Sequence, residues 1–331
     1  MTKPRLIRLV AIVLIAAGLL AGGVAFWGYR VSVAPGPLKE AKTIVIPRGS
    51  GLKDIANRLA AADVIGHPRI FLLVTWLKRA QHELRAGEYA FDPGVSMQGV
   101  LAILREGRTV VRHVTFPEGL TSKEIVAELR RTDGLTGKIA SVPSEGSLLP
   151  NTYHYSYGDT RAEIISRMAK AMDATLAELW AKRAPDLPLT SPTEALILAS
   201  IVEKETAVPA ERPRIAAVFI NRLKKGMRIE SDPTVVYGLT HGAGPLGRPL
   251  TREDLKIDHP YNTYRISGLP PGPICNPGKA SLAAVMNPLK TDELYFVADG
   301  SGGHVFARTL EEHNRNVAKW RKFKRENGNK P

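Results

Sequence analysis

The stretch "SPTEALILASIVEKETAV", Ser191–Val208, carries the clearest helix pattern in the C-terminal half of the chain. Ser191 is suited to be the N-cap, Pro192 to occupy the first helical position, and Glu194 to complete a capping box. The apolar run that follows predicts a helix from Pro192 to about Thr206. This helix is expected to be buried along its length and to reach the surface at its C-terminal end.

Two glutamates, Glu203 and Glu205, lie near the end of this helix, and helical geometry separates them. At about 100° per residue they point roughly 200° apart, so they cannot act as a cooperating acid/base pair. Glu205 continues the bulkier apolar side formed by Leu198, Ile201 and Val202, whereas Glu203 shares its side with smaller and more polar residues. Partial desolvation would raise the pKa of Glu205 and keep it protonated near neutral pH, as a general acid requires. The alternative is an ordinary ion pair between Glu205 and a nearby Arg or Lys.

The composition describes a folded, basic protein with a single cysteine. The 331 residues are 44% hydrophobic, which supplies a substantial core and argues against disorder. Lys and Arg number 46 against 32 Asp and Glu, and the net charge of +14 favours a polyanionic partner such as nucleic acid, anionic lipid or an acidic wall polymer. Cys275 is the only cysteine, which excludes an intramolecular disulfide and a cysteine-based metal cluster.

An uncharged apolar run, Leu9–Tyr29, follows three basic residues near the N-terminus. At about 1.5 Å per residue it spans roughly 30 Å, the thickness of a bilayer core. The run ends in Trp27, Tyr29 and Arg30, as a retained anchor does, rather than in the small residues of a signal-peptide cleavage site. We therefore expect one transmembrane helix with the N-terminus in the cytoplasm and the rest of the chain outside, which weighs against a nucleic-acid partner.

An internal repeat follows the apolar run. "TIVIPRGSGLKDIANRL", from Thr43, and "HVTFPEGLTSKEIVAEL", from His113, align at an offset of 70 residues that pairs Gly49 with Gly119. Each copy predicts a short strand, a Pro-x-Gly turn and an amphipathic helix. Units of this order resemble LysM domains, which bind carbohydrate, and the alternative is a purely structural repeat that packs the membrane-proximal half.

The C-terminal stretch "DELYFVADGSGGHVFARTLEEHN" predicts a strand, a Gly-rich turn, a second strand and a helix. His304, Glu312 and His313 lie in it, but one histidine on a strand and a Glu-His pair on a helix do not reproduce the spacing of zinc proteases. We predict no metal site here. Glu312 and His313 are expected either to tie the hairpin to the core or to contact substrate.

Three stretches together carry a family resemblance: "LASIVEKETAVPAERPRIAAVFINRLKKGMRIESDPTVVYG" (Leu198–Gly238), "YNTYRISGLPPGPICNPG" and "NPLKTDELYFVADGSGGHVFARTLEEHN". With them, the chain resembles the YceG-like family of endolytic murein transglycosylases, known as MltG, over nearly its whole length. The resemblance implies a bacterial inner-membrane lyase that cleaves nascent peptidoglycan strands between N-acetylmuramic acid and N-acetylglucosamine. Such cleavage leaves a 1,6-anhydro end and terminates glycan elongation. In that family the catalytic glutamate is the second one of "EKET", which is Glu205 in this chain.

The chemistry implied by the resemblance needs one carboxylic acid and no metal or organic cofactor. Glu205 would protonate the glycosidic oxygen, and the C6 hydroxyl of the muramic acid would attack in place of water. Polar and aromatic residues near turn-forming prolines are expected to line the cleft, with loop stabilisation as the alternative for each. The predicted substrate-binding residues are Asp232, Thr234, Tyr237, Tyr261, Asn262, Tyr264 and Glu312.

The predicted fold class is α+β, with an N-terminal transmembrane helix, a LysM-like α/β module and a mixed α+β catalytic domain. The chain is expected to cross the bacterial inner membrane once and to place its C-terminal domain in the periplasm. Its expected partners are peptidoglycan strands and, from the family resemblance, peptidoglycan synthases of the penicillin-binding type. The predicted segments are a cytoplasmic N-terminus (1–8), the transmembrane helix (9–29), a linker (30–42), the LysM-like module (43–140) and the catalytic domain (141–331).

Two other functions account for part of the pattern. A membrane-anchored, glycan-binding scaffold would use the anchor, the repeat and the positive charge without using Glu205. A hydrolase of the lysozyme type would use Glu205 but would give reducing ends, because water rather than a sugar hydroxyl attacks.

Overall fold

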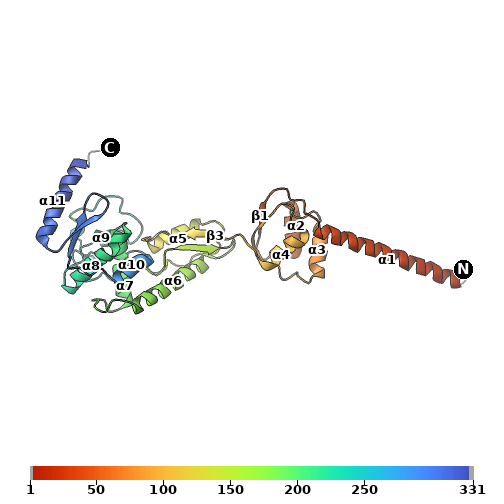
Figure 1. The fold of residues 1–331 in the computed structure, drawn as a ribbon, viewed down its shortest axis with the longest axis horizontal. Coiled ribbons are helices and arrows are strands. Elements are labelled where there is room, and N and C mark those ends of the chain that lie inside the picture. The colour runs from red at the N-terminus through yellow and green to blue at the C-terminus, as the bar shows by residue number, and fades with distance from the viewer. Residues whose placement is uncertain (1–2, 328–331) are drawn as a thin grey trace. The chain divides into compact units, whose positions relative to one another are not determined.

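The computed structural model describes residues 3–327 and has a mixed α+β fold, as predicted (Figure 1). Met1, Thr2 and residues 328–331 lie outside the described residues, so the predicted N-terminus (1–8) and catalytic domain (141–331) are each described in part. The chain divides into two compact units, which are described separately. Unit 1 is Met1–Arg112 with His154–Asp159, and unit 2 is His113–Tyr153 with Thr160–Pro331.

Unit 1 begins with one long apolar helix that leads into a small α/β module (Figure 1). Within it, Val10–Val33 is the one stretch of the described residues that is long and apolar enough to cross a membrane, with a mean hydropathy of 2.4. The predicted transmembrane segment falls almost entirely within this stretch. The elements of unit 1 are α1 (Lys3–Val33), β1 (Lys42–Ile46), α2 (Leu52–Ala61), α3 (Pro68–Leu77), β2 (Gly87–Phe91) and α4 (Met97–Glu106).

The connection between α1 and β1 packs against the module, although residues 30–42 were expected to form an extended linker. α1 continues to Val33, and Gln98 Nε2 donates to Ser32 Oγ at 3.0 Å. The N–H of Gly36 donates to the carbonyl of Gly94 at 3.2 Å, and Leu38 is buried in the module's core. The connection packs against the module because Leu38 is buried in its core and the backbone of Gly36 is hydrogen-bonded to it.

The module is built on the antiparallel pair β1 and β2, with Lys42 opposite Phe91 and Ile46 opposite Gly87. The stretch "GEYAF" forms β2, and the stretch "MQGVLAILRE" after it forms α4. Ser96 caps the N-terminus of α4, and Gly107 ends the helix in the left-handed conformation with φ 70°, where a side chain would be strained. Local sequence signs therefore set these boundaries correctly.

Unit 2 is mainly helical and contains short paired strands. β3 pairs with β4, and β5 pairs with β6 in the antiparallel hairpin predicted around "DGSGG". The elements that lie wholly or partly in unit 2 are β3 (Arg112–Thr115), α5 (Ser122–Arg131), β4 (Thr152–Tyr155), α6 (Arg161–Ala181), α7 (Pro192–Glu205), α8 (Arg212–Lys224), α9 (Asp232–Thr240), α10 (Lys279–Met286), β5 (Tyr295–Ala298), β6 (His304–Ala307), α11 (Leu310–Asn327) and the short 3-10 helices Pro209–Glu211 and Asp254–Lys256.

α7 lies at the centre of unit 2, in contact with α6, α8, α9 and α10. It spans Pro192–Glu205, as the opening stretch predicted, and every residue from Ile197 to Val202 is buried. The predicted capping box is half formed, because Ser191 Oγ accepts the N–H of Glu194 while the Glu194 carboxylate accepts the N–H of Thr190 instead. A helix enclosed on all sides holds its last residues in fixed positions.

The predicted repeat is present as two strand-helix pairs, β1 with α2 and β3 with α5, that begin at the same offset of 70 residues. Both Pro-x-Gly turns use their glycine at positive φ, 84° at Gly49 and 80° at Gly119. The second copy belongs to unit 2, whereas the predicted module (43–140) contained both copies. The second copy also carries a full capping box, in which Thr121 and Glu124 satisfy the first N–H groups of α5.

Candidate active site

Glu205 is the last residue of α7, and its carboxylate accepts a hydrogen bond from a hydroxyl. Ser231 Oγ donates to Glu205 Oε1 at 2.5 Å. Ser231 is 2% exposed, and its N–H donates to Thr263 Oγ1 at 2.9 Å. The preceding residue, Glu230, has φ 56°, a left-handed conformation that is costly for a residue other than glycine. The surrounding chain thus fixes the Ser231 hydroxyl against Glu205.

Burial raises the pKa of Glu205 to about 7. The hydrogen bond from Ser231 opposes this rise because it stabilises the carboxylate, and the negative charge of Asp232 adds to it. The positive charges of His304 and Arg222 lower the pKa by smaller amounts. Half-buried Glu205 therefore retains its proton in a large share of molecules at neutral pH, which is the state that a general acid needs.

Glu203 has a different environment and a structural role. Its side chain is 4% exposed, and its two carboxylate oxygens are both engaged. Arg212 Nη2 donates to Oε1 at 3.2 Å, and the N–H of Gly278 donates to Oε2 at 2.9 Å. The ion pair that was the alternative for Glu205 is therefore made by Glu203, which ties α7 to the N-termini of α8 and α10.

A second carboxylate holds the chain directly after Glu205. Glu211 Oε2 accepts from the Thr206 hydroxyl at 3.0 Å and lies 2.8 Å from His304 Nδ1. The N–H of His304 donates to Glu211 Oε1 at 2.7 Å. This network joins the end of α7 to the start of β6, and it accounts for the proximity of His304 to Glu205.

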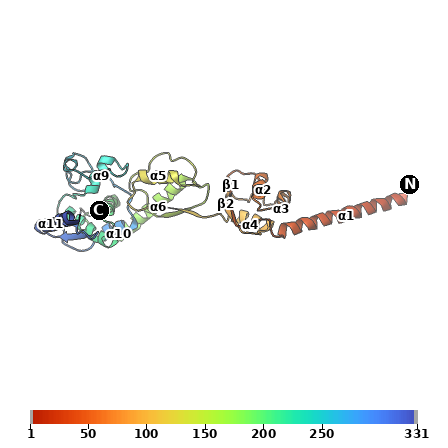
Figure 2. The ribbon, with the colours of Figure 1, turned by 90° about the horizontal axis from the view of Figure 1, so that it is seen from above.

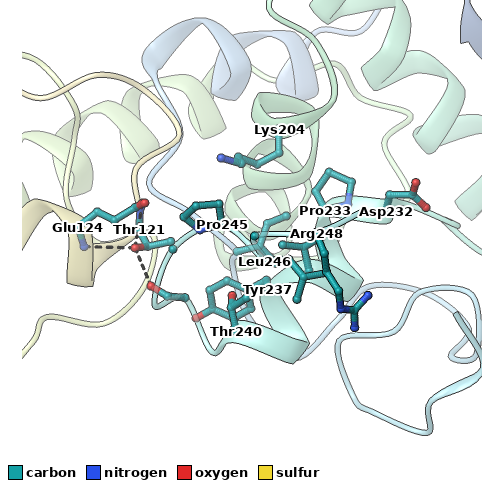
Figure 3. A pocket seen from close by; sticks show the side chains of 15 residues that line it. Thr121, Glu124, Lys204, Asp232, Pro233, Tyr237, Thr240, Pro245, Leu246 and Arg248 are labelled. Atoms are coloured by element: carbon teal, nitrogen blue, oxygen red, sulfur yellow. Dashed lines mark hydrogen bonds between the residues drawn. The ribbon is translucent and has the colours of Figure 1, made fainter. Parts of the chain in front are cut away.

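A cavity of about 480 Å³ lies next to these residues, between the N-terminal turn of α5, α9 and the loop after α9 (Figure 3). In Figure 2, α5 and α9 lie on the same side of unit 2, above α10. Thr121 and Glu124 border one end of the cavity, Asp232 the other, and Tyr237 lies between them (Figure 3). Lys204, the neighbour of Glu205, also lines the cavity. The cavity therefore reaches the end of α7 at which Glu205 lies.

Tyr237 forms part of the cavity wall and is braced from behind. Its ring centroid lies 4.9 Å from that of Tyr261, with the two planes tilted by 47°. The Tyr237 hydroxyl donates to Glu145 Oε2 at 3.3 Å. The other oxygen of Glu145 accepts from the N–H of Ser122 at 2.8 Å and from Asn276 Nδ2 at 3.1 Å. Tyr237 thus lines the cavity, and Tyr261 packs against the Tyr237 ring.

Asp232 and Tyr264 form a pair at the end of the cavity near Glu205. The Tyr264 hydroxyl donates to Asp232 Oδ1 at 2.7 Å. The pKa of Tyr264 is raised above its usual range by burial, by this hydrogen bond and by the charges of Asp232 and Glu205. Figure 3 shows the Asp232 carboxylate pointing away from Tyr237, at the rim of the cavity. Two of the predicted substrate-binding residues therefore lie beside the predicted acid.

Thr234 and Asn262, two of the predicted substrate-binding residues, are buried and do not line the cavity beside Tyr237. Thr234 is 0% exposed and donates to the carbonyl of Ser231 at 2.7 Å. Asn262 is 1% exposed, and its Nδ2 donates to two backbone carbonyls of the preceding loop, the shorter bond being 2.7 Å to Ile257. Both side chains stabilise loops, the alternative given for each, because buried polar groups require partners.

Glu312, another of the predicted substrate-binding residues, makes hydrogen bonds at the start of α11. Its Oε2 accepts the N–H of Arg308 at 3.0 Å and that of Thr309 at 3.4 Å, and its own N–H donates to Thr309 Oγ1 at 3.2 Å. This is the hydrogen-bond pattern of a helix N-terminus. Glu312 therefore caps α11.

Three residues near the site have roles that the sequence analysis did not assign: Ser231, Glu145 and His304. Each acts through a partner distant in sequence, Ser231 on Glu205, Glu145 on Tyr237, and His304 on Glu211. Ser231 directly precedes the turn-forming Asp-Pro pair, which is the one local pattern that marks its position.

Comparison with known proteins gives consistent matches along most of the chain. The model of the YceG-like family matches residues 44–319. A Bacillus subtilis protein named endolytic murein transglycosylase is 33% identical, and the match covers 93% of each chain. A Streptococcus pneumoniae protein of the same name, from strain D39, is 30% identical over 91% of this chain and 62% of its own length. This chain therefore spans less than two thirds of the streptococcal relative.

The fold has a match among solved structures as well. The crystal structure of a yceG-like protein from Listeria monocytogenes aligns with a TM-score of 0.51 and 34% identity, covering 84% of this chain and 99% of that one. The family match, the identity to the Bacillus protein and this shared fold agree with one another. The chain belongs to the YceG-like family.

Proposed function

We propose that this protein is an endolytic murein transglycosylase in which Glu205 is the single acid/base group. The observation that carries the proposal is a half-buried carboxyl group whose pKa is raised to about 7 by burial, which accepts a hydrogen bond from Ser231 and directly follows Lys204, a residue of the cavity wall. Relatives of the same family at 30–33% identity bear that enzyme name. The protein is accordingly a lyase that acts on peptidoglycan.

The reaction uses Glu205 twice. Protonated Glu205 first donates its proton to the glycosidic oxygen as the bond from that oxygen to the anomeric carbon of the muramic acid breaks. The Glu205 carboxylate then accepts the proton of the C6 hydroxyl, whose oxygen bonds to the anomeric carbon and closes the 1,6-anhydro ring. Water is not consumed, and Glu205 returns to its starting protonation state. A pKa of about 7 suits both steps, because neither protonation state is strongly disfavoured near neutral pH.

Asp232, Tyr264 and Tyr237 are proposed to contact the glycan. The Asp232 carboxylate near Glu205 would stabilise positive charge that develops on the sugar ring, and Tyr264 would hold that carboxylate in place. Tyr237 offers a ring to the cavity for stacking against a sugar. Tyr261 is proposed to act behind Tyr237, and this chemistry requires no metal or organic cofactor.

The module of unit 1 is proposed to be LysM-like and to hold the glycan strand. Its strand-helix-helix-strand order, β1, α2, α3 and β2, with the two strands antiparallel, supports this assignment. Binding of purified sacculi by unit 1 within a full chain that carries Glu205→Gln tests it, because the variant cannot release its ligand by cleavage.

Helix α1 is proposed to anchor the protein in the inner membrane with the N-terminus in the cytoplasm and both units outside. Support comes from its apolar stretch, Val10–Val33, whose large apolar side chains from Val10 to Trp27 are exposed, and from the basic residues before it. Protease added to intact spheroplasts should digest units 1 and 2 if this orientation is right. Protection of both units would contradict it.

The decisive experiment for the activity is product analysis with purified full-length protein and uncrosslinked peptidoglycan strands. Wild-type protein is expected to release fragments with anhydro-muramic ends, and Glu205→Gln is expected to release none. A hydrolase would give reducing ends heavier by the mass of one water, and a glycan-binding scaffold would give no fragments from the wild type. Anhydro products from Glu205→Gln would show that the acid lies elsewhere.

A peptidoglycan synthase partner remains a proposal from the family resemblance. Capture of the tagged full-length chain from membranes, followed by labelling with a fluorescent penicillin, tests it directly. Specific recovery of a labelled penicillin-binding protein is the expected result. Equal labelling in a capture from cells without the tag would contradict it.

A further inference from the structure

Helix α3 has an apolar face that its own module does not cover. Phe71 and Thr75 point into the core and are 0% exposed. Leu73, Trp76 and Leu77, at helical spacing on another face, are 55%, 63% and 64% exposed. An apolar stripe of three large side chains on a ten-residue helix is unusual for a surface in contact with water.

The exposed face of α3 lies beside the apolar helix α1. Leu73 and Leu77 of α3 and Leu20 and Val24 of α1 line one groove of about 620 Å³, whose lining is mostly apolar side chains. The lining on α1 also includes the small residues Ala17, Ala21, Ala25 and Gly28. At the start of α3, the His67 ring lies 5.9 Å from the ring of Trp27. Figures 1 and 2 both show α3 next to the C-terminal part of α1.

The position of the groove along α1 gives its depth in a bilayer. Trp27 and Tyr29 are the aromatic residues that mark the membrane interface at the end of the apolar run. Leu20 lies nine residues before Tyr29, a distance of about 13 Å along a helix at 1.5 Å per residue. The groove that Leu20 shares with α3 thus extends from the interface into the acyl-chain region.

Basic side chains border the apolar face of α3. Arg69, Lys78 and Arg79 are all exposed, and the Lys78 ammonium donates to Gln98 at 3.1 Å. Interfacial helices bury an apolar face about 5–10 Å into the boundary between headgroups and acyl chains, with basic residues reaching the headgroups. α3 is short, but it combines these features with a fixed place beside a membrane-spanning helix.

We infer that α3 lies in the outer leaflet beside α1, with Leu73, Trp76 and Leu77 in contact with lipid acyl chains. This inference rests on the proposed anchoring of α1. α3 then gives unit 1 a second membrane contact beside α1, which sets the face that the module turns toward the bilayer. Lipid is the occupant that the groove favours, because its apolar face is continuous with the lipid-exposed surface of α1 and its rim is basic.

The test uses the full-length chain in liposomes, with an environment-sensitive fluorophore on one engineered cysteine. Leu77→Cys reports on α3, Leu14→Cys on the anchor, and Lys53→Cys on an exposed part of α2 in the same module. The native Cys275 is 0% exposed, so native protein without an added cysteine serves as the labelling blank. Lipids with a spin label just below the headgroup quench fluorophores at that depth.

Quenching at position 77 is expected to exceed that at position 53 severalfold, together with blue-shifted emission. If position 14 is quenched while 77 behaves like 53, the anchor is present and the inference about α3 is overturned. If neither 14 nor 77 is quenched, the anchoring proposal itself fails. Energy transfer between protein copies labelled at 77, without quenching by lipid, would show that a second copy rather than lipid covers the face.

Discussion

Glu203 and Glu205 lie two residues apart on one helix and have opposite environments. Glu203 accepts hydrogen bonds from the Arg212 guanidinium and from the N–H of Gly278. Glu205 accepts a hydroxyl hydrogen bond, lies near the negative charge of Asp232 and has its pKa raised by burial. The difference shows that the partners around a carboxyl group, rather than burial alone, divide structural from chemical roles.

The largest expected effect is on catalysis by Glu205→Gln. Removal of a general acid/base group reduces the rate by about 10²–10⁴-fold, and a glutamine cannot donate a proton to the glycosidic oxygen. The rate of anhydro-fragment release measures this effect, and a thermal unfolding curve like that of the wild type is the matched control. A loss smaller than tenfold would remove the distinction between the two glutamates.

Glu203→Ala should instead reduce stability. The substitution leaves the largely buried Arg212 and the N–H of Gly278 without this partner, and the loss of one member of a buried ion pair costs about 3–5 kcal/mol. Because Arg212 also contacts Glu118, the lower end of that range is expected. Chemical denaturation of unit 2 within the full chain measures the loss. Unchanged stability together with abolished cleavage would assign the chemistry to Glu203.

The stability of Glu205→Gln should depend on pH in a defined direction. The pKa of Glu205 is about 7 in the folded chain against an ordinary value of 4.5, so the folded wild type loses stability as the pH rises from about 4.5 to about 7, and the loss is complete above pH 7. Below about pH 4.5 the group is protonated in both states and contributes no difference. Glutamine should therefore stabilise unit 2 by about 1–3 kcal/mol near pH 8 and by little near pH 4.5. A larger gain at low pH would contradict the raised pKa.

Asn262→Ala is expected to act on the fold and leave substrate binding unchanged. Its amide holds two loop carbonyls, so truncation should cost about 1–2 kcal/mol of stability. The KM for glycan strands should stay at the wild-type value in the folded fraction. An increased KM together with a wild-type unfolding curve would show that Asn262 contributes to substrate binding.

Ser231→Ala should give the smallest change and shift the pH dependence. The Ser231 hydrogen bond stabilises the Glu205 carboxylate, so its loss raises the pKa of Glu205 and moves the high-pH limb of activity upward. A decrease in kcat within about tenfold is expected, as for the loss of one hydrogen bond. A shift of the high-pH decrease in activity to lower pH would contradict this role of Ser231.

The sequence predicted the local elements well, because their causes are local. The start of α7 follows from Ser191 and Pro192, and the two Pro-x-Gly turns follow from glycines that adopt positive φ. The prediction of Glu205 was right in its direction of pKa shift, but the apolar-stripe argument was weak. Ile197–Val202 is buried on every side, so helical phase alone does not separate the two glutamates.

The partners that decide the site are long-range and were therefore not predictable from pattern. Ser231 lies 26 residues from Glu205, and Gly278 lies 75 residues from Glu203. Thr234 and Asn262 illustrate the same limit of local pattern, since polar residues beside prolines fit a cleft and a buried loop equally well in sequence. Burial and hydrogen-bond partners separate these two cases only in the folded chain.

The pH profile of kcat/KM for anhydro-fragment release, measured for wild type and Glu203→Gln, tests the central claim most directly. Both proteins are expected to lose activity as the pH rises through about 7, because Glu205 loses its proton there in each. Glu203→Gln should retain most of the wild-type rate below that limb. Disappearance of the limb, or of the activity itself, in folded Glu203→Gln would contradict the assignment of Glu205 as the acid.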